Sequence, residues 1–223
     1  MGFHERLLAE TKRDQEELFA TPFIRHALAG RVSREGYLAF LGEAYHHVRH
    51  TVPLMMSTGA ALAERHRWLI GPLAEYIEEE VGHEEWILSD IAACGGDAEA
   101  VRRSEPGPAC ELMVAFAYDV VQRRNPLGFF GMVHVLEGAS IRGASAGAAV
   151  VVEKLGLPAD ATTYLRSHGA LDQEHVAFFR GLMDRIEDVS DQDFILHCAR
   201  RFFRLYGDIY RSLPLPDANE VTR

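Results

Sequence analysis

Apolar residues recur at three- and four-residue spacing along most of this 223-residue chain. That spacing places them on one face of an α-helix, which turns once every 3.6 residues. Alternating β-branched runs joined by Asn-Gly or Asp-Gly turns, which mark strands and hairpins, are missing from the sequence. The sequence therefore predicts an all-α protein.

No repeat, low-complexity segment or linker divides the chain, so we expect one domain over residues 1–223 with a loose tail over 214–223. A chain of this size can bury a substantial core. Start and stop signals predict about seven or eight helices, with a break at Gly71-Pro72 and strain at Gly82. The expected segments are 3–19, 22–30, a helix that Ser33 caps and Pro53 ends, 60–94, 109–124, 126–156, a helix that Asp160 caps, and 193–213.

Composition argues against several classes of function. The net charge is −10 and no Lys/Arg cluster offsets it, which disfavours nucleic-acid binding. The most apolar stretch, Ala144 to Val152, is far shorter than the ~20 residues that span a bilayer. The N-terminus has no apolar run typical of a signal peptide. The odd number of cysteines (Cys94, Cys110, Cys198) favours a reducing compartment, and we expect a cytoplasmic protein.

The segment from His168 to Glu174-His175 holds the most specific motif, His-x3-Asp-x2-His. Positions i, i+4 and i+7 lie within roughly 60° of one another around a helix. His168, Asp172 and His175 therefore project from one helix face, as ligands of a metal ion do. A surface ion pair between the first two is the ordinary alternative.

Two other segments offer further ligands. Glu80-x-x-His83 is an i, i+3 pair, and Gly82 between its members lets a ligand or another backbone approach at about 1 kcal/mol in helix propensity. Glu137 is a single acid in an apolar helix, where it would be costly to bury without a partner. The six predicted ligands are Glu80, His83, Glu137, His168, Asp172 and His175.

Three carboxylates and three imidazoles suit iron or manganese better than zinc, which usually prefers thiolates in structural sites. A dinuclear site with a bridging carboxylate would balance the charge, as in helix bundles with di-iron centres. Glu80 could instead belong to a solvated acidic face, and Glu137 could pair with Arg142 or His134. The combination of all three segments is much harder to explain by chance.

Other polar residues give weaker signals. Glu43-x-x-His46 repeats the Glu-x-x-His pattern, and we expect one residue among His46, His47 and His50 to line the cavity. His134 could support a ligand or carry a proton. Arg142 could hold a substrate carboxylate, although an ordinary ion pair is the simpler role.

The order of these motifs resembles the haem-oxygenase-like dimetal oxidases, which share a seven-helix fold with haem oxygenase, thiaminase II and the pyrroloquinoline-quinone-synthesis C proteins. The phrases Glu79-Glu-Val-Gly-His-Glu-Glu-Trp86 and Val135-Leu-Glu-Gly-Ala-Ser140 are similar to members described as iron-containing redox enzymes. The likeness extends roughly from Leu18 to Leu213. The expected fold is therefore a haem-oxygenase-like bundle of about seven helices.

The resemblance implies a non-haem centre of two iron ions per chain, held by the six predicted ligands, with O2 as co-substrate. It also implies a small organic substrate. The Glu-x-x-His spacing is closer to the subgroup that decarboxylates fatty acids, whereas other relatives oxidise amines or amino-acid side chains. An external electron donor is possible on this interpretation, and a homodimer is the default assembly.

Four alternatives remain open. A true haem oxygenase would use Gly138, Gly143 and Gly147 to seat haem, and would show a Soret band. A thiaminase II-like hydrolase would need one of the three cysteines as nucleophile. A ferritin-like carboxylate protein would need a second Glu-x-x-His late in the chain, which is missing. A non-enzymatic helical module would bind no stoichiometric iron.

Overall fold

The computed structural model describes residues 2–216, and within them the side chains of all residues except 141–146 and 168–175. Over this part of the chain there are eleven α-helices, three short 3-10 helices and no strand, so the all-α prediction is confirmed. The α-helices are α1 (Phe3–Phe19), α2 (Pro22–Leu28), α3 (Arg34–Val48), α4 (Thr51–Ala61), α5 (Ile70–Glu80), α6 (His83–Ala93), α7 (Ala98–Arg103), α8 (Pro108–Arg123), α9 (Phe129–Leu155), α10 (Thr163–Met183) and α11 (Val189–Ser212). The 3-10 helices are η1 (Glu64–Leu69), η2 (Pro126–Gly128) and η3 (Ala159–Thr162).

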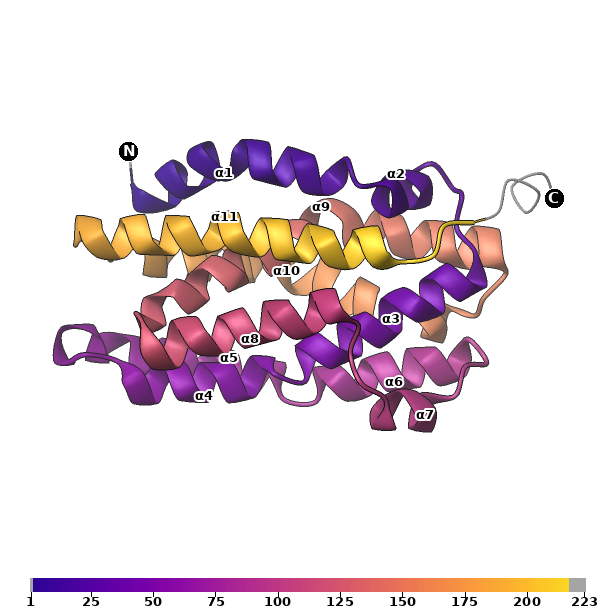
Figure 1. Ribbon diagram of the computed structural model, residues 1–223, viewed down its shortest axis with the longest axis horizontal. Coiled ribbons are helices and arrows are strands. Elements are labelled where there is room, and N and C mark those ends of the chain that lie inside the picture. Colours follow the sequence, from indigo (N-terminus) through magenta and orange to yellow (C-terminus); the bar gives the residue numbers. More distant parts are fainter. Residues whose placement is uncertain (1, 217–223) are drawn as a thin grey trace.

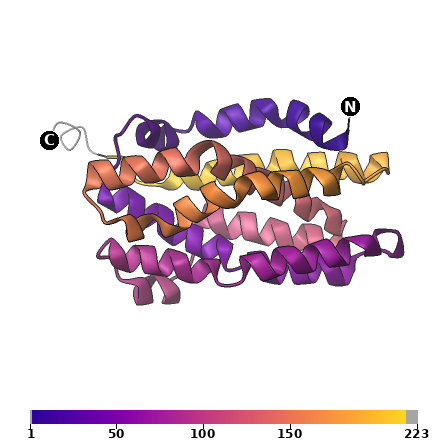
Figure 2. The same ribbon diagram turned by 180° about the vertical axis from the view of Figure 1, so that it is seen from behind.

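The helices form a bundle in which most axes follow the long direction of the molecule (Figure 1). Helices α1 and α2 form one side, and α11 runs next to α1 in both views (Figures 1 and 2). Helices α4, α5 and α6 form the opposite side (Figure 2). Helix α9 packs against both α10 and α11, and its first residues, 129–135, are buried throughout and lie in the interior of the bundle.

A close approach between α9 and α11 depends on glycine. A Cβ atom at Gly131 would lie 2.6 Å from the backbone nitrogen of Ala199 and 2.9 Å from the carbonyl oxygen of Ile195. No side chain fits there, and the two backbones meet directly. This contact fixes the N-terminal half of α9 against α11, and thereby positions the polar residue that follows, Glu137.

Two clusters of buried apolar residues make up the interior. The larger one joins α1, α4, α5, α8, α9 and α11, and includes Leu7, Phe130 and Phe202. The smaller one joins α3, α6 and η3, and includes Leu41 and Ile91. Burying such side chains stabilises the fold by roughly 1.5–3 kcal/mol each. The two clusters leave a cavity where they meet, because residues of both line it.

Several helix boundaries differ from the sequence prediction. Pro53 does not end a helix, because α3 ends at Val48 and Pro53 lies in the first turn of α4, where a missing N–H costs nothing. Gly71-Pro72 does not break a helix either, since both residues lie in the first turn of α5. The last helix begins at Val189, where the Asp188 side chain accepts a hydrogen bond from the Ser190 amide.

The N-terminus of α10 is capped from a distance. The sequence predicts Asp160 as the cap, but this residue lies in η3, so that prediction is wrong. The carboxylate of Asp90 in α6 instead accepts hydrogen bonds from the backbone amides of Thr163 (3.0 Å) and Tyr164 (2.9 Å). The hydroxyl of Tyr37 donates to the carbonyl of Ala161 at 2.8 Å, which secures the same turn to α3. These bonds set the direction in which α10 starts.

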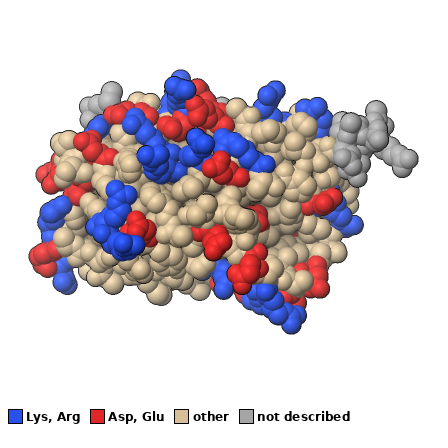
Figure 3. Space-filling model, in the orientation of Figure 1, with Lys and Arg blue, Asp and Glu red and all other residues tan. Residues whose placement is uncertain are grey.

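Charged residues are mixed on the outer surface. On the face shown in Figure 3, positive and negative side chains alternate over α1 and α11. Arg6 pairs with both Glu10 and Asp193, and Arg200 also pairs with Glu10. Exposed pairs of this kind contribute little, about 0–1 kcal/mol each. Over the part of the chain that the structure describes, none of the helices has the length and apolarity needed to span a bilayer.

Replacing the remote cap tests its contribution to stability. Asp90 is fully buried, so Asp90→Ala leaves two amides of α10 without an acceptor and is expected to cost about 1–2 kcal/mol in urea unfolding. Asp97 caps α7 through the Ala100 amide in an exposed position, where water replaces the lost acceptor. Asp97→Ala is therefore expected to cost less, and an equal or larger cost would contradict the role assigned to Asp90.

Candidate active-site cavity

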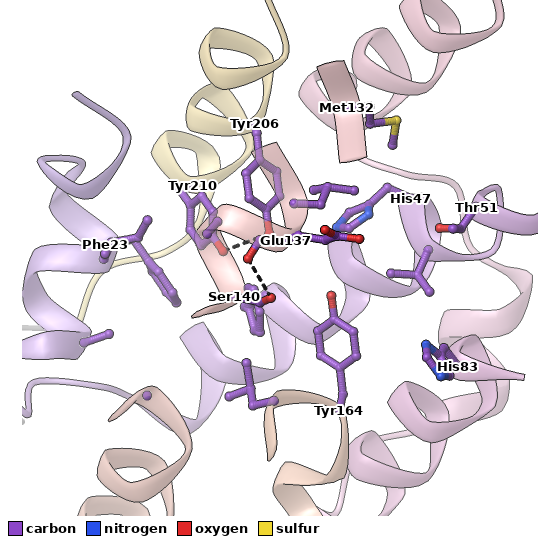
Figure 4. A pocket seen from close by; sticks show the side chains of 18 of the residues that line it. Phe23, His47, Thr51, His83, Met132, Glu137, Ser140, Tyr164, Tyr206 and Tyr210 are labelled. Atoms are coloured by element: carbon purple, nitrogen blue, oxygen red, sulfur yellow. Dashed lines mark hydrogen bonds between the residues drawn. The ribbon is translucent and has the colours of Figure 1, made fainter. Parts of the chain in front are cut away.

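A cavity of about 170 Å³ lies at the junction of the two apolar clusters. Four polar residues, Glu80, His83, Glu137 and His47, form what we call its polar end. Five rings form what we call its aromatic arm: Phe23, Tyr37, Phe40, Tyr206 and Tyr210. Figure 4 shows Phe23 on one side of the cavity and His83 on the other, with the tyrosine pair and Glu137 between them.

Glu80 and His83 meet across a turn and not along one helix face. Glu80 is the last residue of α5 and His83 is the first of α6, so the expected continuous helix is interrupted at Val81-Gly82. Gly82 has φ +91° and ψ 0°, a left-handed conformation that separates the end of α5 from the start of α6. A Cβ atom there would touch nothing within 4 Å, so conformation and not close approach explains the glycine.

The turn brings the two side chains into direct contact. Nδ1 of His83 lies 3.0 Å from Oε2 of Glu80, and the side chains are only 2% and 14% exposed. The His83 ring stacks on Trp86, with 4.0 Å between ring centroids. His83 is therefore buried and held in place by packing, and Glu80 is partly buried. The two side chains are adjacent, although the shared helix face expected from the sequence is wrong, and their role as ligands stays a prediction. The alternative of a solvated face for Glu80 is not supported.

Glu137 faces the same cavity from α9. Tyr76 lines the cavity as well, and its burial together with the nearby Glu137 carboxylate raises the pKa of Tyr76 far above its ordinary value. The hydroxyl of Ser140 donates to the backbone carbonyl of Glu137 at 3.1 Å (Figure 4). Tyr76 thus supplies part of the polar contact that a carboxylate needs in an apolar helix.

The third predicted ligand segment lies outside the described side chains. His168, Asp172 and His175 belong to α10, whose backbone is helical from Thr163 to Met183. Helix α10 packs against α9 and α6, the helices that carry Glu137 and His83. Among the side chains that the structure describes, no group of three or more His, Cys, Asp or Glu residues is placed to hold a metal. The convergence of all six ligands therefore stays a prediction, and Arg142 also lies outside the described side chains.

Of the histidines in α3 and the following turn, one lines the cavity and two do not, as expected. His47 lines the cavity and meets the Tyr206 ring edge-on, with centroids 5.7 Å apart. His46 hydrogen-bonds to Ser104 at 3.0 Å, and His50 to Tyr118 at 3.1 Å, so both have structural roles. One histidine of the three lines the cavity.

The second Glu-x-x-His motif is structural as well. The Glu43 carboxylate accepts a hydrogen bond from the Gly107 amide at 3.0 Å, just before the first turn of α8. A helix N-terminus attracts negative charge, which explains an acid at this position. Glu43 and His46 therefore do not contribute to the cavity.

His134 fastens α9 to α1 and does not bond to Glu137. Its Nε2 atom lies 2.9 Å from the Thr11 hydroxyl, which itself donates to the Leu7 carbonyl at 2.7 Å. Because a hydroxyl has one proton, His134 must be the donor and carries its proton on Nε2. Its ring packs between Phe179 and Phe203. The pairing with Glu137 and the proton-carrying role expected from the sequence are not supported.

Sequence reasoning missed the tyrosines of the cavity. Tyr76, Tyr206 and Tyr210 occupy apolar positions of amphipathic helices, where spacing alone does not distinguish them from core residues. Tyr206 and Tyr210 are one helical turn apart, and their hydroxyls are hydrogen-bonded at 3.1 Å. That i, i+4 spacing on α11 was the one available signal.

None of the three cysteines lines the cavity. Burial raises the pKa of Cys94 to about 11, and those of Cys110 and Cys198 to about 12. A thiol that stays protonated is a poor nucleophile. This observation weighs against the thiaminase II-like alternative.

Comparison with known proteins agrees with this geometry. A family model described as iron-containing redox enzyme matches residues 38–207. The chain belongs to this family. No curated protein is significantly similar in sequence.

Comparison with solved structures identifies the fold of this chain. A domain of unknown function with a haem oxygenase-like fold from Shewanella denitrificans has a TM-score of 0.84 and 22% identity, over 94% of this chain and 90% of that one. Haem oxygenase-1 from Synechocystis, solved with haem, has a TM-score of 0.76 and 14% identity, over 99% of this chain and 95% of that one. A TenA homologue from Pseudomonas syringae has a TM-score of 0.76 and 10% identity, over 93% of this chain and 90% of that one. The predicted haem-oxygenase-like fold is confirmed.

Gly82→Ala tests the turn that joins Glu80 to His83. An alanine at φ +91° is expected to cost about 1–2 kcal/mol in urea unfolding, and asparagine less, because it tolerates the left-handed region better. Gly71 of α5 is the matched control, since a Cβ there also meets nothing within 4 Å but the backbone is helical. Gly71→Ala is expected to be neutral or stabilising. Equal effects at both glycines would contradict the conformational role assigned to Gly82.

The buried histidine of α9 predicts acid sensitivity. Burial lowers the pKa of His134 from 6.5 to about 4, so the unfolded chain binds the proton more readily than the folded one. Its contribution to stability is present above pH 6.5 and declines as the pH falls from 6.5 toward 4. His134→Phe is expected to reduce the stability lost between pH 7 and pH 5 by about 2 kcal/mol, measured by urea unfolding. If the variant and the wild type lose the same stability between pH 7 and pH 5, His134 is not the source of the acid sensitivity.

Proposed function

We propose that this family member is a non-haem di-iron oxidase that uses O2 to oxidise a small organic substrate. The observation that supports this most directly is the Glu80–His83 pair, which lines one largely apolar cavity together with Glu137. Carboxylate and imidazole are the ligands that iron accepts in such bundles. The family description, iron-containing redox enzyme, agrees with this donor chemistry.

The proposed ligands are the three described residues, Glu80, His83 and Glu137, and three from α10, His168, Asp172 and His175. The backbone of α10 is helical over the last three, which keeps them on one face. Three carboxylates would offset three of the four positive charges of two ferrous ions. A site of low net charge is the kind that an apolar interior tolerates.

Iron in this cavity would supply the reduction of O2 and the oxidation of the substrate. The protein holds the ligands and excludes water. Trp86 packs against the His83 ring and fixes its orientation, and the Tyr76 hydroxyl lies near the Glu137 carboxylate. Met132 and Val133 of α9 add buried apolar surface to the wall of the cavity.

The remaining features of the proposal come from the sequence. The substrate would be a fatty acid or an amine-like or amino-acid-like molecule, and an external donor would supply electrons. We further propose a homodimer without nucleic-acid or membrane partners. The proposed iron ligands do not depend on which of these substrate classes the protein uses.

A haem-binding protein is the second proposal, because the fold also matches haem oxygenase. The size of the cavity argues against it. A volume of about 170 Å³ is below the roughly 300–1,000 Å³ of pockets that hold drug-sized ligands, and haem is at least that large. A Soret band after haem titration would favour this second proposal.

Iron binding tests the di-iron proposal, and the second Glu-x-x-His motif supplies the control. Anaerobic titration of the iron-free protein with ferrous iron, followed by desalting, is expected to retain about two ions per chain. His83→Gln removes a proposed ligand and is expected to reduce retention to about one ion or fewer. His46→Gln changes the same residue type in the same motif, away from the cavity, and is expected to retain both.

Exposure of the loaded protein to O2 is expected to give a transient visible absorption in the wild type and in His46→Gln only. Full iron retention by His83→Gln would refute the ligand assignment. Less than one ion in the wild type under every loading condition would refute the di-iron proposal itself.

A further inference from the structure

The aromatic arm is a continuous wall of rings and not a set of isolated side chains. Phe40 stacks on Tyr210, with 5.9 Å between centroids and 19° between planes, and also on Phe23 and Tyr37 at 6.4 and 6.2 Å. Tyr206 meets Tyr210 edge-on at 5.0 Å. All five rings line the cavity. Offset-stacked and edge-to-face geometries are the contacts that aromatic rings prefer with one another, so the wall offers the same contacts to an aromatic ligand.

The hydroxyls of Tyr206 and Tyr210 give this wall a polar point. They are bonded to each other at 3.1 Å, and either can be the donor. Two hydroxyls hold two protons, and their shared bond uses one of them. A second proton and further lone pairs remain, so the pair can donate to, or accept from, a hydroxyl on a ligand. Figure 4 shows the pair beside Glu137, between Phe23 and the polar end.

Burial keeps both tyrosines protonated. It raises the pKa of Tyr206 and of Tyr210 above the ordinary value, and each is affected further by the other hydroxyl. The pair is therefore neutral and able to donate at any physiological pH. The described lining contains two carboxylates, Glu80 and Glu137, and no lysine or arginine. In the iron-free protein, those residues provide no cation for an anionic head group.

The size of the cavity limits the ligand. A cavity of about 150 Å³ in another protein admits benzene, and this one measures about 170 Å³. One six-membered ring with a small substituent fits that volume.

We infer that the cavity binds a phenol-class ligand, one aromatic ring with a hydroxyl group. The ring stacks on Phe40 and Phe23, and the hydroxyl bonds to Tyr206 or Tyr210. This inference depends on the proposed function only in treating the ligand as the substrate. It narrows the substrate from a fatty acid or amine to a phenol, and orients the ring edge toward Glu137 and His83.

Calorimetric titration of the iron-free protein tests the inference without any need for activity. The probes are phenol, benzene, cyclohexanol and hexanoate. Phenol is expected to bind more tightly than cyclohexanol, which has the hydroxyl without the flat ring, and more tightly than hexanoate. Equal or tighter binding of cyclohexanol or hexanoate to the wild type would overturn the inference, and this comparison needs no variant.

Variants then separate the hydroxyl contact from the ring contact. The double variant Tyr206→Phe/Tyr210→Phe is expected to reduce the ratio of phenol to benzene affinity by about threefold to tenfold, the value of one hydrogen bond. Tyr118→Phe is the control, because the Tyr118 hydroxyl bonds to His50 and does not line the cavity. It is expected to leave the ratio unchanged. An unchanged ratio in a folded double variant, checked by circular dichroism, would overturn the inference.

Iron titration of the same protein gives an independent result. If phenol binds as described and iron does not, the ligand class stands and the di-iron proposal fails. If two irons bind and phenol does not, the di-iron proposal stands and the phenol-class inference fails.

Discussion

A carboxylate in an apolar interior needs compensation, and the buried acids of this protein obtain it in different ways. Asp90 accepts two backbone amides from the start of α10. Asp191 accepts from the side chains of Arg65 and Asn125 and lies 3.0 Å from His66. Both acids join segments distant in the sequence and are satisfied by protein groups alone. Glu137 and Glu80 differ, because their partners Tyr76 and His83 line a cavity that is open to a further ligand.

That difference separates structural acids from the candidate site better than burial does. Asp90 and Asp191 are the more deeply buried, at 0% and 1% exposure, yet neither lines the cavity. An ion placed beside either would have to displace bonds that already stabilise the fold. At the polar end an ion would add charge compensation where two carboxylates face one space. The position of the cavity, where two apolar clusters fail to fill the interior, is what makes room for this chemistry.

The sequence predicted the helical class, the family and three residues of the polar end, Glu80, His83 and Glu137, because each depends on short-range spacing. It did not predict the Asp90 cap, since the bond joins residues more than 70 positions apart and any of several acids could have served. It also missed the turn at Gly82, where two helices of similar composition follow each other. The tyrosine pair escaped notice for another reason: on amphipathic helices a tyrosine that lines a cavity and one that fills a core have the same spacing.

The two Glu-x-x-His motifs show how far local pattern alone determines function. At Glu43 and His46 the helix continues through the motif, and the acid turns to the positive end of α8 while the imidazole bonds to Ser104. At Glu80 and His83 the left-handed glycine ends one helix and starts another, so both side chains are directed to the interior. The distinguishing feature is thus the residue between the motif's ends, and not the ends themselves. A glycine with positive φ here places the two side chains of the motif next to each other in the cavity.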